Sequence, residues 1–425
     1  MRLLYDLFFC LFSLVYIPSL LLRGKFHRGF IERFGFIPKE LGSLKRPVWI
    51  HAVSVGEALV AVKLARAIKK VFPDASVVVS TTTRTGNEMI RRCAEGSIDA
   101  FFYYPLDMSF IVRRVVRLLE PRLYVMVETE LWPNILVELS KRGIAAVLVN
   151  GRISDKSFAG YRKIKFITRR ILKNIDSFLM QSPRDAERIR DMGASAGKIS
   201  VTGSMKFDEA APSFSERDLI NREKLGFTGG DKIIVAGSTH HPEETIVVDI
   251  YRSLREKMAG LKLILAPRHI ERIGEIKSFV EGKGLAVCGL SEMLKGGEAA
   301  SGKCDVLLVD TIGHLKDLYS VASIVFIGGS LARKGGQNPI EAARWQKPIV
   351  FGPHMSNFRE VSEVFLEHSA AVEVRDSSHL KEVCEKVLKD PAESERLAKA
   401  AGKVIESNSG AVDKTVERIK KYINP

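Results

Sequence analysis

The sequence lacks the cysteine patterns of a disulfide-rich or metal-binding domain. Its five cysteines lie far apart, form no CxxC pair and show no cysteine–histidine ligand spacing. Thiols in such a pattern are typically reduced and packed, so we predict no zinc site. The chain also contains no low-complexity tract and no short internal repeat. Nothing in the composition therefore indicates a disordered or repetitive protein.

Two signatures of nucleotide and nucleic acid binding are also missing. No strand leads into a GxGxxG turn with an acidic residue about 20 positions later, which argues against a nicotinamide dehydrogenase. No helix-turn-helix, zinc-finger or aromatic-interleaved sheet motif accompanies the basic residues, which argues against nucleic acid as a partner. The 65 Lys and Arg outnumber the 50 Asp and Glu, and the net charge is +15. This excess indicates another anionic partner, such as acidic lipid or a phosphorylated substrate.

The N-terminus contains a long apolar run. Leu7–Leu22 has sixteen residues without a charge, slightly fewer than the about 20 that span a bilayer. A cleaved signal peptide is the alternative, but only Arg2 precedes the run as a basic residue and no small-x-small site follows it. Basic residues after the run favour an uncleaved membrane anchor at 1–28, spanning or interfacial, with the body of the protein in the cytoplasm.

The rest of the chain alternates short β-branched runs with helical patterns, which predicts parallel α/β units in two doubly wound domains. In the first half we expect strands over Val48–His51, Ser76–Ser80, Ala100–Tyr104, Leu123–Val127, Ala145–Val149, Phe178–Gln181 and Ile199–Thr202. In the second half we expect strands over Lys232–Ala236, Leu261–Ala266, Leu285–Cys288, Asp305–Val309, Ile324–Ile327, Pro348–Phe351 and Ala371–Val374. A polar linker at 209–231 is expected between domains at 40–208 and 232–410, and a C-terminal helix at 411–425.

A basic helical stretch is expected over Gly160–Asn174. Its isoleucines and leucine fall near one face, and six Lys and Arg side chains cover much of the rest. Such a helix either docks on an anionic membrane surface or packs its apolar stripe on the sheet, and the sequence leaves both readings open.

Three segments carry candidate chemistry. HAVSVGEA places Glu57 where a strand gives way to a helix, and ETELWPN places Glu128 and Glu130 directly after the strand that ends at Val127. Loops at that end of parallel strands carry the chemistry of doubly wound sheets. The third segment, IGGSLARKGGQNPIEAA, is a predicted strand followed by four glycines and a predicted helix start, which suits a phosphate or a ribose. Carboxylates in one half and an anion site in the other indicate group transfer from a nucleotide.

Eight motifs in one order carry a family resemblance. They are SVGE at 54–57, ETELWPN at 128–134, NGRIS at 150–154, VTGSMKFD at 201–208, GSTH at 237–240, APRH at 266–269, DTIG at 310–313, and GGSL with GGQNPIEAA at 328–343. Over essentially the whole chain they resemble the 3-deoxy-D-manno-octulosonic acid (Kdo) transferases of Gram-negative bacteria. The resemblance implies a GT-B type fold, with two Rossmann-like domains facing across a cleft. It also implies inverting transfer of Kdo from CMP-Kdo to a lipid A precursor at the cytoplasmic face of the inner membrane.

On the acceptor side, the resemblance implies that Glu57 is the proton acceptor and Glu128 the transition-state stabiliser, with Lys206 as a neutralising cation. A carboxylate can serve as the base that a sugar hydroxyl needs, but a glutamate in the first turn also caps helices. Glu130 is expected to hold the loop or the cleft wall. On the donor side, the expected CMP contacts are Pro267, Arg268, Ile312, Gly313, His314, Asn338, Pro339, Ile340 and Glu341, with Ser238 and Thr239 beside them. Some relatives have glutamate at the position of His314, so only its backbone is expected to bind.

No cofactor or metal is expected besides the donor substrate. CMP is a monophosphate leaving group, and Arg268, Lys206 and a helix N-terminus can offset its charge. Two alternatives stay open at this stage. One is a GT-B transferase or epimerase that uses a UDP-sugar, and the other is a non-catalytic, membrane-tethered binding protein.

Overall fold

The computed structural model describes residues 5–7, 9, 11, 29, 31–93, 96–208, 222–294 and 304–424. Most of the predicted anchor at 1–28 and most of the predicted linker at 209–231 lie outside these residues. None of the helices within these ranges has both the length and the apolar character needed to cross a bilayer. The chain forms two compact units, and unit 1 takes up Met1–Glu209 together with Asn408–Pro425, whereas unit 2 is Ala210–Ser407.

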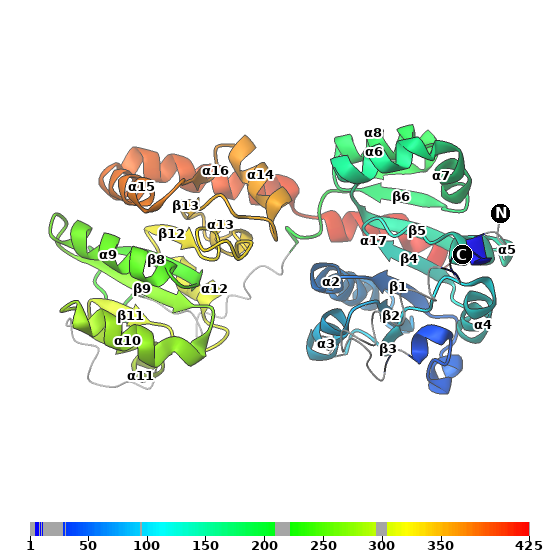
Figure 1. The fold of residues 1–425 in the computed structure, drawn as a ribbon, viewed down its shortest axis with the longest axis horizontal. Helices are drawn as coiled ribbons and strands as arrows, with labels where there is room; N and C mark the ends of the chain where they lie inside the picture. Colours follow the sequence, from blue (N-terminus) through cyan, green and yellow to red (C-terminus); the bar gives the residue numbers. More distant parts are fainter. Residues whose placement is uncertain are drawn as a thin grey trace. The chain divides into compact units, whose positions relative to one another are not determined.

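Unit 1 is a seven-stranded parallel sheet covered by helices (Figure 1). Its strands are β1 Val48–Ala52, β2 Val77–Thr81, β3 Ala100–Tyr103, β4 Leu123–Val127, β5 Ala145–Gly151, β6 Ser177–Met180 and β7 Ile199–Val201. Its helices are α2 Val55–Val71, α3 Arg84–Cys93, α4 Ser109–Leu119, α5 Pro133–Lys141, α6 Asp155–Lys163, α7 Lys165–Leu172, α8 Pro183–Asp191 and α17 Ala411–Ile423. The strand order is β3-β2-β1-β4-β5-β6-β7.

Unit 2 has a second seven-stranded parallel sheet, in the order β10-β11-β9-β8-β12-β13-β14. Its strands are β8 Lys232–Thr239, β9 Leu261–Pro267, β10 Val287–Gly289, β11 Val306–Leu308, β12 Ile324–Ile327, β13 Ile349–Phe351 and β14 Val372–Glu373. Its helices are α9 Glu243–Arg255, α10 Ile273–Gly282, α11 Leu290–Leu294, α12 Leu315–Leu318, α13 Ile340–Ala343, α14 Arg359–Glu367 and α15 Ser377–Lys389. Helix α16, Pro391–Asn408, ends where the chain returns to unit 1.

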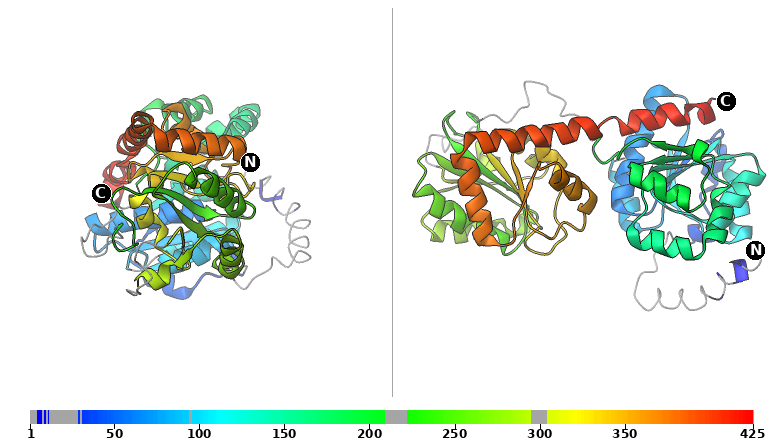
Figure 2. Two further views of the ribbon diagram at one scale, coloured as in Figure 1. Left: turned by 90° about the vertical axis from the view of Figure 1, so that its left-hand side faces the viewer. Right: turned by 90° about the horizontal axis from the view of Figure 1, so that it is seen from above.

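Both faces of the unit 1 sheet are buried, which explains why its strands are apolar runs rather than alternating patterns. In β1, Val48 and Ile50 point into one hydrophobic cluster and Trp49 into the other. The C-terminal helix completes the first cluster, because Ile419 and Ile423 of α17 pack there. Figure 2 shows α17, in red, lying along unit 1.

The predicted basic helix is two helices. Ile164 has φ −115° and ψ 30°, outside the helical region, and it separates α6 from α7. The expected apolar stripe is divided as well. Leu172 and Ile171 pack in the core of unit 1, whereas Ile164 and Ile167 remain 48% and 43% exposed. Tyr161 of α6 also packs against this core, so the packing alternative applies to both ends of the stretch, whereas Ile164 and Ile167 between them stay exposed.

Candidate functional site

Glu57 lies in the first turn of α2, directly after β1. The Ser54 hydroxyl accepts from the Glu57 backbone N–H (3.3 Å), and Glu57 Oε1 accepts from the Ser54 N–H (3.3 Å), so the two residues form a capping box. The carboxylate also accepts from the Val53 N–H (2.8 Å) and the Ser54 hydroxyl (2.8 Å). These three donors use three of the roughly four lone-pair positions of a carboxylate. One position is left for a ligand, so capping and chemistry are compatible.

Burial is the main reason why the pKa of Glu57 is raised above its usual range. The nearby Glu128 carboxylate raises this pKa further, whereas the hydrogen bonds from Val53 and Ser54 lower it. A carboxylate with a raised pKa is a better proton acceptor at neutral pH, provided that it is still ionised. Glu57 is therefore chemically suited to take a proton from a hydroxyl group.

Glu128 is held in an unusual backbone conformation at the end of β4. Its φ is +59°, in the left-handed region that glutamate seldom adopts. The Glu128 N–H donates to the Val149 carbonyl of β5 (3.0 Å), which helps to impose this geometry. Glu128 Oε1 lies 3.4 Å from Lys206 Nζ. Residues in strained backbone conformations concentrate at functional sites. A strained conformation costs free energy, and it persists only where the surrounding structure enforces it.

Glu130 belongs to the same electrostatic cluster. Burial raises the pKa of Glu130 to about 7, and the carboxylates of Glu57 and Glu128 act in the same direction. The structure thus brings together all three glutamates that the sequence singles out in this half of the chain. Because they repel one another, their protonation states are linked.

The loop that carries Lys206 is fixed by residues outside the predicted set. Asn150, buried at the end of β5 with φ +52°, accepts from the Met205 N–H through Oδ1 (3.0 Å). Lys63 Nζ of α2 donates to the carbonyls of Met205 (3.3 Å) and Lys206 (3.4 Å). Asp208 accepts from the Gly410 N–H (2.6 Å) just before α17. Three separate elements of unit 1 therefore determine where Lys206 lies.

In unit 2, the glycine-rich segment begins with a close backbone contact. Ser238, near the end of β8, has φ +53° and accompanies a register irregularity between β8 and β9. A Cβ on Gly328 would lie 2.4 Å from the Ser238 carbonyl oxygen. Only glycine therefore allows the chain after β12 to pass this close to Ser238.

A buried glutamate holds the next part of this segment. Glu243 is fully buried, and its carboxylate accepts from four backbone N–H groups. The donors are Gly329 (2.7 Å), Leu331 (2.8 Å), His240 (2.9 Å) and Ala332 (3.1 Å). These amides bind a protein carboxylate, so an anionic ligand has to be held by other groups.

Several buried polar atoms at the carboxyl end of this sheet have no hydrogen-bond partner within the described residues. They are Thr239 Oγ1 at the end of β8, His240 Nε2 directly after it, and Thr311 Oγ1 after β11. The His240 ring lies 5.3 Å from that of His269, which follows β9. Buried polar groups are normally paired, so three unpaired atoms at the carboxyl end of β8 and β11, the strands on either side of β9, indicate a ligand site.

Most of the other residues that were expected to contact CMP lie around this end of the sheet. Pro267 is buried at the end of β9, and the Arg268 N–H donates to the Thr239 carbonyl (2.9 Å) while its side chain is exposed. Ile312 is 81% exposed, and Gly313 has φ +99° with open space where a Cβ would stand. His314 precedes α12 and is half-buried.

Residues Asn338–Glu341 are connected by two local hydrogen bonds of the Asn338 side chain. Asn338 Oδ1 accepts from the Ile340 N–H (3.1 Å), and Asn338 Nδ2 donates to Glu341 Oε1 (3.3 Å). Pro339 and Ile340 are buried, whereas Asn338 and Glu341 are half-buried. The amide and the carboxylate are thus fixed relative to each other at the start of α13.

Comparison with known proteins identifies the family. A model of the 3-deoxy-D-manno-octulosonic-acid transferase (kdotransferase) family matches residues 28–209. The 3-deoxy-D-manno-octulosonic acid transferase of Chlamydophila psittaci is 31% identical over 426 residues, covering 99% of this chain and 96% of that protein. That of Haemophilus influenzae is 30% identical over 419 residues, covering 98% and 96%.

The chain belongs to the Kdo transferase family. It is therefore a glycosyltransferase, and the resemblance drawn from the eight motifs is confirmed.

Solved structures support the fold of this Kdo transferase family member. The chain is similar to the UDP-GlcNAc 2-epimerase of Neisseria meningitidis with a TM-score of 0.56 and 12% identity, covering 88% of this chain and all of that one. It is similar to MnaA of S. aureus with a TM-score of 0.55 and 11% identity, covering 89% and 97%. At this identity the likeness concerns the fold alone, which is of the GT-B kind.

Sequence reasoning missed two residues, namely Asn150, which fixes the Lys206 loop of unit 1, and Glu243, which fixes the glycine-rich segment of unit 2. Asn150 stands in the NGRIS motif, and asparagine tolerates positive φ, which was the available signal. Glu243 follows the GSTH motif, but nothing in the sequence indicates that its carboxylate accepts hydrogen bonds from backbone amides more than 80 positions away.

Within the described ranges, no group of three or more His, Cys, Asp or Glu side chains is arranged to hold a metal ion.

Proposed function

We propose that this protein transfers Kdo from CMP-Kdo to a lipid A precursor, a tetraacyldisaccharide bisphosphate, with inversion at the anomeric carbon, in lipopolysaccharide core biosynthesis. The observation that carries the proposal is the Glu57–Glu128–Lys206 arrangement, in a chain of this family. Glu57 has a raised pKa and a free lone-pair position, and Glu128 stands in a strained conformation beside a cation.

In the proposed reaction, an acceptor hydroxyl attacks the anomeric carbon of Kdo. The new carbon–oxygen bond forms as the bond to the phosphate oxygen breaks, and CMP leaves with the electron pair. Glu57 takes the hydroxyl proton, since it is the carboxylate with the basicity and the open acceptor position. Glu128 stabilises the positive charge that develops on the sugar ring, and Lys206, which lies beside it, helps to position its carboxylate.

The CMP part is assigned to the carboxyl end of the unit 2 sheet. The unpaired Thr239 and Thr311 hydroxyls are available to the nucleotide, and the Arg268 side chain suits a phosphate oxygen. Glu341 can accept from ribose hydroxyls, as acidic residues do in related doubly wound sites. No metal is required, because CMP carries less charge than a diphosphate. Transfer is therefore expected to continue in EDTA, and a tenfold loss that magnesium restores would contradict this.

The proposed location is the cytoplasmic face of the inner membrane, with the segment at 1–28 as an anchor. Two hydrogen bonds of Asp6 connect this segment to the rest of unit 1. Asp6 Oδ1 accepts from Asn134 Nδ2 (2.7 Å) and from the Ser109 N–H (3.1 Å), at the starts of α5 and α4. Membrane fractionation of the full chain, compared with a chain that begins at residue 29, tests this assignment. Equal recovery of both chains in the soluble fraction would contradict it.

The experiment that tests the reaction is a transfer assay with the purified full chain, CMP-Kdo and the tetraacyldisaccharide acceptor, counting the sugars added by mass spectrometry. A parallel arm measures thermal protection by CMP and by UDP, because a ligand that binds the folded state raises its melting temperature. Transfer with preferential protection by CMP is expected. Protection by UDP alone, without transfer, would favour a UDP-sugar enzyme instead, as the structural neighbours are. A folded protein that binds CMP but transfers nothing would favour the non-catalytic alternative.

A further inference from the structure

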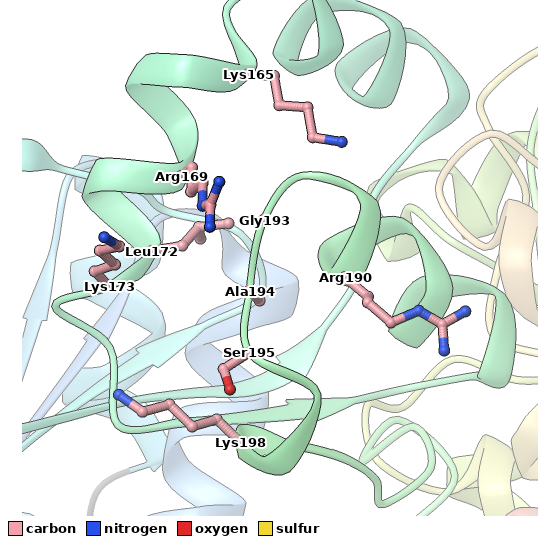
Figure 3. A pocket seen from close by; sticks show the side chains of 9 residues that line it. All are labelled: Lys165, Arg169, Leu172, Lys173, Arg190, Gly193, Ala194, Ser195 and Lys198. Carbon is pink, nitrogen blue, oxygen red and sulfur yellow. The ribbon is translucent and has the colours of Figure 1, made fainter.

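Unit 1 contains a cavity of about 530 Å³ with a strongly basic lining (Figure 3). Five of its nine lining residues are Lys or Arg, and none is Asp or Glu. The five cationic residues are Lys165, Arg169, Lys173, Arg190 and Lys198. Figure 3 shows that they come from α7, from the end of α8 and from the turn before β7.

Among the residues that the structure describes, no carboxylate forms an ion pair with a cation of this cavity. Within the described residues, Lys165, Arg169, Lys173 and Arg190 form no ion pair, and Lys198 Nζ donates to the Ile175 carbonyl (2.7 Å). Like charges held at one site raise the local potential, which concentrates anions there. The cavity is therefore suited to bind a compact anion such as a phosphate group.

The cavity has a built wall rather than a chance grouping of surface side chains. Gly193, in the turn after α8, has φ +110°, and a Cβ there would lie 2.8 Å from Cβ and Cγ of Arg169. Helix α7 therefore packs against this turn more closely than any other residue at 193 would allow. The contact holds the stem of Arg169 in place.

The cavity is separate from the carboxylate site. It is formed by the segments that lead into β6 and β7, and so it lies at the amino end of the sheet. Glu128 follows the last residue of β4, at the carboxyl end. All strands of this sheet are parallel, so the two sites lie at opposite ends of strands that are about 13–17 Å long.

The surface beside the cavity indicates which phosphate compound it takes. Ile164 and Phe166 flank Lys165 in sequence and are 48% and 67% exposed, and Ile167 is exposed as well. The Arg170 guanidinium lies 4.3 Å from the centre of the Phe166 ring. Exposed apolar side chains among cations are typical of helices that lie at an anionic membrane surface. A soluble phosphate compound would bind the cations but leave these apolar side chains unexplained.

We propose that this cavity binds the phosphate head group of an anionic phospholipid, with Phe166 and its apolar neighbours in contact with the membrane interface. The cavity is a lipid site of unit 1 in addition to the segment at 1–28. This inference does not depend on the reaction proposed above, since it concerns the opposite end of the sheet.

Native mass spectrometry of the full chain in neutral detergent tests the proposal, with phosphatidylglycerol and phosphatidylcholine added in parallel. The test variant is Lys165→Gln/Lys173→Gln/Arg190→Gln, which keeps Arg169 and its contact with Gly193. The control variant is Arg252→Gln/Lys277→Gln/Lys403→Gln, which removes the same charge from exposed positions of unit 2. Melting curves first establish that both variants are folded.

We expect selective retention of phosphatidylglycerol by the wild type, a loss of at least tenfold in affinity for the test variant, and no change for the control. Phe166→Ser should weaken phosphatidylglycerol binding but not the binding of glycerol phosphate, which is titrated as the soluble probe. Equal retention of the two lipids, or equal loss in both triple variants, would overturn the proposal. Glycerol phosphate binding that the test variant abolishes, without preference for phosphatidylglycerol, would show a soluble-anion site and reject the lipid. None of these readouts involves Kdo transfer, so failure here leaves the proposed reaction untouched.

Discussion

Glu57 in unit 1 and Glu243 in unit 2 occupy comparable places, since each lies in the first turn of the helix that follows a central strand of its sheet. Their environments differ. Glu243 accepts from four backbone amides, whereas Glu57 accepts from two amides and one hydroxyl and lies near two other carboxylates. Backbone amides favour the charged form, whereas burial and like charges disfavour it. The comparison teaches that a glutamate at the same point of the same fold can have two roles. Glu243 stabilises the local structure of unit 2, whereas Glu57 is a candidate base in unit 1.

The largest expected effect concerns the glutamate assigned to chemistry. Glu57→Gln keeps one acceptor oxygen for the capping box, but it removes the basicity and places an NH₂ group against one of the donors from Val53 and Ser54. We expect the rate of Kdo transfer to fall about 10²–10⁴-fold, the usual contribution of a general base, together with a modest fall in melting temperature. Glu138→Gln, a buried glutamate of α5 paired with Arg142, is the matched control and should retain activity within about twofold. Equal losses in the two variants would remove the distinction between Glu57 and an ordinary buried glutamate.

The second effect concerns the glutamate assigned to structure. Glu243→Gln places an NH₂ group against backbone N–H donors and leaves some of them unpaired. We expect the free energy of unfolding of unit 2 to fall by about 2–3 kcal/mol, because hydrogen bonds to buried charges are among the stronger ones. Urea denaturation of the full chain checks this. An unchanged midpoint together with lost transfer would reverse the roles given to the two glutamates.

A smaller effect is expected for the unpaired Thr239 hydroxyl at the end of β8. Thr239→Val removes Thr239 Oγ1, which has no hydrogen-bond partner among the described residues, and nearly preserves the shape. We expect CMP to bind about tenfold more weakly, while stability is unchanged or slightly raised. Calorimetric titration with CMP measures this. Unaltered affinity would mean that the unpaired atoms of unit 2 do not face the nucleotide.

The smallest effect is a pH dependence in the carboxylate cluster. The pKa of Glu130 is raised to about 7 in the folded protein, against an ordinary value near 4.3. Between these pH values the folded state binds more protons than the unfolded state, so the stability contributed by neutral Glu130 is present below about pH 4 and is lost as pH rises through 7. Glu130→Gln mimics the neutral form. It should raise the melting temperature by about 2–4 °C at pH 8 and not at pH 4.

A second buried carboxyl group, that of Asp107, also contributes to the pH dependence of stability. Burial raises the pKa of Asp107 to about 7 as well, so it titrates in the same window. Glu130→Gln should therefore remove only part of the pH dependence of the wild type. A melting temperature that Glu130→Gln leaves unchanged at every pH would mean that Glu130 is not coupled to the cluster.

All fourteen strands could be predicted from the sequence to within a few residues. They are apolar, β-branched runs between turn residues, and burial on both faces leaves them no alternative conformation. The C-terminal helix was also predicted. Helix α16 was not predicted, and the break at Ile164 was missed because no Gly or Pro marks it. Local pattern identifies a strongly periodic segment better than it locates the ends of helices.

The candidate site was predicted in part. The motifs placed Glu57, Glu128 and Glu130 at strand ends, and the structure gathers them into one electrostatic cluster. Sequence spacing could not show that the Lys206 loop depends on Asn150, which is 55 positions away. Nor could sequence spacing show that the Glu243 carboxylate accepts hydrogen bonds from backbone amides of the glycine-rich segment. The roles in catalysis stay predictions, and the experiments above test them.

The sequence by itself determined the family, the two parallel sheets and the residue types available for chemistry, because these follow from local pattern and motif order. Only the tertiary structure decided which carboxylates repel one another, which accept hydrogen bonds from backbone amides, and where five cations gather without an ion-pair partner in the described part of the chain. The physical reason is that pKa values and hydrogen-bond satisfaction depend on distance and burial. Both of these are properties of chain segments brought together by folding, and neither can be read from positions along the chain.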